Sequence, residues 1–165
     1  MRPLIPEKLN SRLDEIVTKC FEGNRISDRG MSILSVKFVM NKTEKLLHDK
    51  LAHLYPMLAD KVSSFQGSRN NLTFYGFTPA DGSDYDTPLE FFEKLLSYMN
   101  DLETLVSEIL DESREEDAVT YVFLEDFLRA LIPVTEQCLL LVDKAEMYKD
   151  NYMAFDRGVE SFMIL

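Results

Sequence analysis

Three side chains at helical spacing could hold a metal ion. Glu44 and His48 lie one helical turn apart, and at about 100° per residue both fall on the apolar side of their segment. Glu103 lies at the edge of the apolar stripe of a later segment. A carboxylate and an imidazole that face a second carboxylate could share a cation, because the cation offsets the cost of desolvating them. The sequence therefore predicts Glu44, His48 and Glu103 as ligands of iron or another divalent metal.

The same residues also fit a purely structural role. Glu44 and His48 could form a hydrogen-bonded polar pair inside the bundle, and Glu103 could extend its carboxylate to the rim. His53 falls on the opposite side of the segment that carries His48, where we expect it to be solvated. Gln137, at the edge of another apolar stripe, is expected to be a rim residue rather than a ligand.

Other chemistries lack their motifs in this sequence. There is no Gly-x-Ser-x-Gly turn, no glycine-rich phosphate loop and no nucleotide fingerprint. Asp81, Asp84 and Asp86 lack the closing glutamate of a calcium loop and are interpreted as turn formers. Cys20 and Cys138 are far apart in sequence, which favours two small core residues in a reducing compartment over a zinc or dithiol site.

Size and charge point to a single domain over residues 1–165. The chain has 165 residues, of which 45% are hydrophobic, enough for one core. The formal charge of -11 repels nucleic acids and anionic membrane surfaces. Proline interrupts the first residues twice and no apolar run is long enough to span a bilayer, so we expect a cytoplasmic protein without nucleic-acid or membrane partners.

Apolar periodicity predicts four helices. A short helix is expected over about 6–21, where Gly23 and Asn24 follow its last apolar residues, and a long one over about 29–65, bent at Pro56. Two more are expected over about 87–110 and 118–152, the first opened by a capping box of Thr87, Pro88 and Glu90. An apolar tail, 153–165, should dock onto the helices or onto a second subunit.

The connections predict how these helices are arranged. The polar link 111–117 is short, so the helices on either side should be antiparallel neighbours. Residues 66–86 have no helical period and are numerous enough to cross the whole height of a bundle. The expected fold is therefore an all-α antiparallel four-helix bundle with a long crossover between its second and third helices.

The chain resembles the ferritin-like superfamily, in particular the small bacterial mini-ferritins. The similar parts are Leu47 and His48, the run 54–62, the crossover 72–82, the helix start 88–92 and the fourth helix. The resemblance implies iron binding or storage, a role in oxidative stress, and a homodimer or larger shell. Di-iron members carry a Glu-x-x-His motif that this sequence lacks, so the metal site would be altered or lost. The alternative is a non-enzymatic helical module that binds other proteins.

Overall fold

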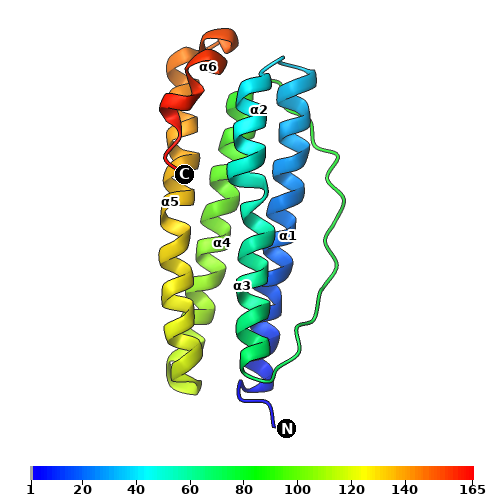
Figure 1. The fold of residues 1–165 in the computed structure, drawn as a ribbon, viewed down its shortest axis with the longest axis vertical. Coiled ribbons are helices and arrows are strands. Elements are labelled where there is room, and N and C mark those ends of the chain that lie inside the picture. Colours follow the sequence, from blue (N-terminus) through cyan, green and yellow to red (C-terminus); the bar gives the residue numbers. More distant parts are fainter. Residues whose placement is uncertain (1) are drawn as a thin grey trace.

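The structure, a computed structural model, describes residues 2–165 and is helical apart from its connections. Four rods run side by side along the long axis (Figure 1). The second rod is made of three consecutive pieces that include a π-helical segment, η1. The helices are α1 (Glu7–Val36), α2 (Asn41–Leu47), η1 (His48–Ala52), α3 (Leu54–Ser68), α4 (Pro88–Glu116), α5 (Ala118–Tyr148), α6 (Tyr152–Gly158) and a 3₁₀ turn, η2 (Val159–Phe162).

The crossover 69–87 determines the topology. It runs beside α1 from one end of the bundle to the other, so that α4 starts at the same end as α2 (Figure 1). The second rod is thus antiparallel to α1 and parallel to α4, whereas α5 runs antiparallel to α4 after a one-residue link at Asp117. The prediction of an all-α four-helix bundle with a long crossover is confirmed.

The first helix, α1, is longer than predicted. Gly23, which was expected to end it, lies inside it, as does Gly30. A Cβ built on Gly23 would lie 2.4 Å from the Tyr98 hydroxyl oxygen, and one on Gly30 would lie 1.9 Å from the Phe91 ring. Both glycines are buried, so each lets an aromatic ring of α4 pack directly against the α1 backbone. The expected end of this helix near residue 21 was wrong, since these glycines serve close packing instead of ending the helix.

The second predicted helix, 29–65, is broken twice. The first break, at residues 37–40, is the turn between α1 and α2, so residues 29–36 belong to α1. In this turn Val39 has a φ of 57°, an unusual value for a β-branched residue. A second irregularity is η1, in which the His53 N–H donates to the His48 carbonyl at 3.3 Å, five residues back. Pro56 follows within one turn and has no N–H to donate to the Ala52 carbonyl. The Asn24 side chain of α1 donates to that carbonyl instead, at 3.1 Å.

Replacing Asn24 by alanine should therefore destabilise the bundle. The buried Ala52 carbonyl would lose its partner, at an expected cost of about 1–2 kcal/mol in the free energy of unfolding. Urea denaturation followed by circular dichroism measures this loss. The exposed Asn100→Ala change in α4 is the control and should be nearly neutral. Equal stabilities of the two variants would contradict this role of Asn24.

The C-terminal tail docks onto its own bundle. The Gln137 side chain is fully buried in α5, where it donates to the Phe162 carbonyl at 2.9 Å and accepts from the Ile164 N–H at 2.7 Å. Asp156 of α6 accepts from both the N–H and the hydroxyl of Thr43, so it caps the first turn of α2. Gln137, expected at the rim, is thus a buried anchor for the tail.

None of the helices in residues 2–165 combines the length and the apolarity that crossing a bilayer requires.

Candidate functional site

Glu44 and His48 lie at the edge of the second rod and not in the core. The buried positions of α2 and η1 are Thr43, Leu47, Leu51 and Ala52, and both Glu44 and His48 are only half-buried. The His48 side chain is 41% exposed, and its Nδ1 lies 3.6 Å from the Asp28 carboxylate of α1. The expected inward orientation of Glu44 and His48 is therefore not found.

Glu103 belongs to a different part of the molecule. It is half-buried on α4 and accepts a hydrogen bond from the Thr135 hydroxyl of α5. Across residues 2–165 no group of three or more His, Cys, Asp or Glu side chains is placed to hold a metal ion. The structure thus does not bring Glu44, His48 and Glu103 together as one set of ligands.

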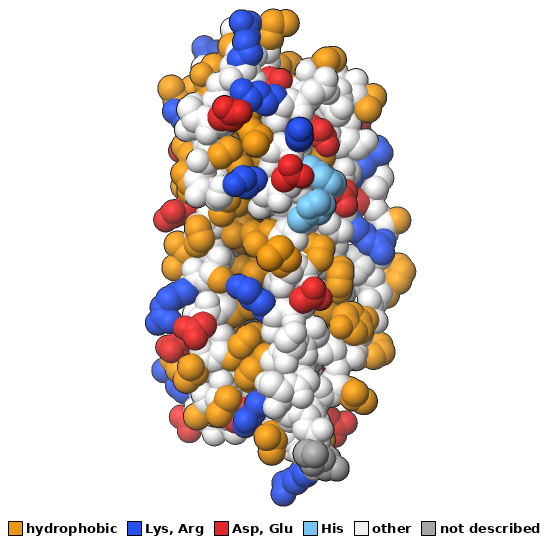
Figure 2. Space-filling model, viewed as in Figure 1, with side chains coloured by type: hydrophobic (Ala, Val, Ile, Leu, Met, Phe, Trp, Pro, Cys, Tyr) orange, Lys and Arg blue, Asp and Glu red, His pale blue; other side chains and the backbone are white. Residues whose placement is uncertain are grey.

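The two histidines of the chain form a pair on the surface. The ring centroids of His48 and His53 are 4.4 Å apart and their planes make an angle of 67°. Figure 2 shows the two imidazoles touching on an open face of the bundle. In a regular α-helix these residues would point about 140° apart. The wider turn of η1 places them on one side, which periodicity at 100° per residue could not predict.

The centre of the bundle holds tyrosines and thiols. The Tyr55 and Tyr98 rings meet edge to face at 5.3 Å, and the Tyr98 hydroxyl donates to the Lys19 carbonyl at 2.6 Å. Burial raises the pKa of both hydroxyls well above their usual value. Burial likewise raises the pKa of Cys20 and Cys138 to about 12. These groups stay protonated at neutral pH, so the thiols are not nucleophiles.

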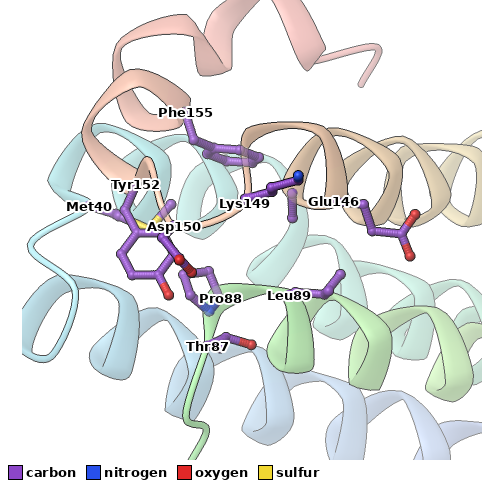
Figure 3. A pocket seen from close by; sticks show the side chains of 10 residues that line it. Met40, Thr87, Pro88, Leu89, Glu146, Lys149, Asp150, Tyr152 and Phe155 are labelled. Carbon is purple, nitrogen blue, oxygen red and sulfur yellow. The ribbon is translucent and has the colours of Figure 1, made fainter.

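A pocket of about 230 Å³ opens where α4 begins and α5 ends. Figure 3 shows Phe155 of α6 above it and Pro88 and Leu89 of α4 below. Charged side chains, those of Glu146, Lys149 and Asp150, lie along its side, and Lys149 has a φ of 50° in the turn that follows α5. The lining comes from segments far apart in sequence, which is why the sequence alone did not predict this hollow.

A row of exposed apolar side chains follows the crossover. We call it the crossover strip; its members, with their exposed fractions, are Leu72 (91%), Phe74 (70%), Tyr75 (60%) and Phe77 (86%). Four apolar side chains so exposed within six residues are unusual for a free surface. The sequence showed that this connection is rich in aromatics, but not which way the side chains point.

The fold matches solved ferritin structures over nearly its whole length. A humanized archaeal ferritin superposes with a TM-score of 0.88 at 16% identity, covering 98% of this chain and 97% of that one. An open-pore ferritin from the hyperthermophilic archaeon Archaeoglobus fulgidus gives 0.86 at 16% identity, with 98% of each chain covered. A form of that ferritin engineered to be closed gives 0.85, also at 16% identity and with 98% of each chain covered. The chain thus has the fold of a ferritin-like four-helix bundle, as its sequence resemblance implied.

Sequence comparison adds no finer assignment. No protein-family model matches the chain, and no curated protein is significantly similar to it in sequence. The superposition on ferritin structures, at 16% identity, therefore establishes the fold alone. Function depends on the side chains of this chain.

The interior does not offer the donor set of a di-iron centre. In ferritin-like di-iron bundles, glutamates and Glu-x-x-His motifs point inward from facing helices. In residues 2–165 the buried polar side chains are uncharged and none is an imidazole; they are Ser27, Thr43, Gln66, Asn71, Thr78, Ser113, Thr120 and Gln137. Hydroxyl and amide groups among leucines, tyrosines and thiols are poor iron ligands, so the interior does not fit such a centre.

Proposed function

We propose that this chain is a self-associating ferritin-like subunit that has lost the iron-oxidising centre inside the bundle. The observation that supports the proposal most strongly is the crossover strip, which presents apolar side chains on a backbone held in place by α1. An interior without carboxylates or imidazoles supports the second half of the proposal.

Polar side chains of α1 and of Lys37, which follows it directly, hold the crossover at intervals along the bundle. Near its start, Asn10 donates to the Leu72 carbonyl at 2.9 Å and Asp14 accepts from the Phe74 N–H at 3.0 Å. Farther along, Arg29 donates to the Ser83 carbonyl at 2.7 Å and Lys37 to the Tyr85 carbonyl at 2.7 Å. The strip is thus preformed, and a partner would bind it without first paying to order the loop.

A second copy of the chain is the partner that these features favour. Aromatic residues are enriched in protein interfaces, and a two-fold dimer lets the same strip supply both halves of the contact. The tail, the other apolar segment, is already docked intramolecularly through Gln137, so it does not compete for this role. Self-association also agrees with the structural match. One matching structure is described as an open-pore ferritin, and a pore of that kind implies an assembly of several chains.

The strip can be tested by its effect on mass in solution. Light scattering coupled to size exclusion should show the wild type as a dimer or larger assembly. The double variant Leu72→Asp/Phe77→Asp should be a monomer with unchanged helicity, because both side chains are exposed within one chain. Met147→Asp/Met153→Asp, two side chains that are each 70% exposed elsewhere, is the matched control and should keep the wild-type mass. A monomeric wild type, or strip variants that keep the assembly, would refute the proposal.

Iron storage at groups outside the interior is the second candidate. It is favoured by the full-length match to ferritin folds and by the excess of acidic residues, 29 against 18 basic ones. An excess of surface carboxylates raises the local concentration of cations around the protein. Such a role needs no oxidation centre within the bundle, and it would show as iron that stays with the assembly through gel filtration.

A further inference from the structure

We propose that His48 and His53 form a surface site for a divalent transition-metal ion of the class that imidazole binds, such as Zn²⁺ or Cu²⁺. This site is separate from the interior of the bundle and independent of the self-association proposed above. Its basis is the juxtaposition of two imidazoles by η1, with an acidic side chain behind one of them.

The geometry of η1 is the first argument. A π-helical turn is a costly local irregularity, and such turns occur frequently at functional sites. Here the turn brings His48 and His53 to a centroid distance of 4.4 Å with tilted rings. Two rings that bind one ion each place a nitrogen about 2.0–2.1 Å from it, which requires neighbouring rings that are not stacked face to face. The pair meets that requirement and lies open to solvent (Figure 2).

Asp28 is the second argument. Its carboxylate lies 3.6 Å from the His48 Nδ1, on the neighbouring helix α1. Metal-binding histidines commonly direct the ring nitrogen that does not bind the metal toward a carboxylate, which orients the ring and makes it a better ligand. With Nδ1 facing Asp28, the His48 Nε2 is the nitrogen left for the metal.

The type of ligand, two imidazoles, sets the class of ion. No third His, Cys, Asp or Glu within residues 2–165 completes a metal-binding group, so water must fill the remaining positions. Hard cations such as Mg²⁺ and Ca²⁺ prefer oxygen ligands, whereas imidazole favours Zn²⁺, Cu²⁺ and Ni²⁺. A net charge of -11 adds a general attraction for cations.

Calorimetric titration of the tag-free protein with Zn²⁺ tests the site. We expect one Zn²⁺ per chain, and at least ~10-fold weaker binding for His48→Gln and for His53→Gln, with Asp28→Asn weakened by a smaller factor. All three side chains are half-exposed or exposed, so the variants should fold normally, which circular dichroism can check.

Two controls separate this pair from other sites. Glu44→Gln and Glu103→Gln should bind Zn²⁺ as the wild type does, because neither carboxylate belongs to the pair. Loss of binding in those variants, unchanged binding in both histidine variants, or no binding by the wild type would each overturn the proposal. A wild type that binds Mg²⁺ as tightly as Zn²⁺ would do so as well.

Discussion

Raising the pH from about 9 to about 11 should lower the free energy of unfolding by about 5 kcal/mol through Cys20 and Cys138 alone. Each thiol has a pKa of about 12 in the folded protein, against an ordinary value of 9.0. Above pH 9 the unfolded chain releases these protons while the folded chain keeps them. The contribution of the two thiols to the free energy of unfolding is therefore fully present below pH 9 and is lost as the pH rises toward 12.

The two buried tyrosines should steepen this loss above pH 10. The pKa values of Tyr55 and Tyr98 are also raised by burial, so their hydroxyls ionise first in the unfolded chain. Urea midpoints measured across the alkaline range give the slope. In the double variant Cys20→Ala/Cys138→Ala the slope between pH 9 and pH 10 should fall to less than half of the wild-type slope, whatever the variant's stability at neutral pH, and the remainder comes from the tyrosines. The same slope with and without the thiols would contradict their burial in the protonated form.

Gly30→Ala should destabilise the protein although alanine is the better helix former. The new Cβ would lie 1.9 Å from the ring of Phe91, a fully buried side chain, so the ring or α1 must move. We expect a net loss of about 2 kcal/mol in the free energy of unfolding, since overpacking a core costs about 1–3 kcal/mol and outweighs the gain in helix propensity. Thermal and urea denaturation both measure this loss.

Gly67 provides a control of the opposite sign. It lies in α3 with no atom near the position of an added Cβ, so Gly67→Ala should raise the free energy of unfolding by about 0.5–1 kcal/mol. Trimming the facing ring in Gly30→Ala/Phe91→Leu should make the cost of the added methyl group smaller than in the wild-type background. If both glycine variants are stabilised, the packing of α4 on α1 is not as close as the structure has it.

The sequence was sufficient for the architecture because the apolar stripes are regular. The start of α4 was predicted to the residue: the Thr87 hydroxyl accepts from the Glu90 N–H at 3.2 Å, and Pro88 is the first helical residue. The extent of α1 could not be predicted, since a glycine that ends a helix and one that admits a neighbouring ring look alike in sequence. Only the positions of Phe91 and Tyr98 on α4 distinguish the two roles.

The candidate site was harder to predict because it depends on small departures from regular helix geometry. Glu44 was expected to point inward by periodicity, but the buried face of α2 centres on Thr43 and Leu47 and leaves Glu44 half-buried at its edge. His53 was expected opposite His48, but the π-helical turn places the two rings in contact. The sequence carries one hint of that turn, Pro56, whose missing N–H disturbs the helix one turn earlier.

The way the core is built agrees with the proposal that the bundle has no interior iron centre. At the height where Tyr55, Tyr98 and Met99 meet, two aromatic rings and a thioether fill the space between the helices. All three side chains are at most 2% exposed. An ion placed there would have to displace well-packed apolar groups and would find no carboxylate to neutralise it. At this height the bundle is thus stabilised by packing and offers no ligands for an ion.

Anaerobic loading with Fe²⁺ followed by exposure to air tests this central claim most directly. We predict no rapid, saturable oxidation phase with a fixed number of iron atoms per chain, and only the slow oxidation seen with surface-bound or free iron. A saturable phase in the wild type would contradict this claim, and its loss in Glu44→Ala or Glu103→Ala would show that these half-buried carboxylates hold the iron.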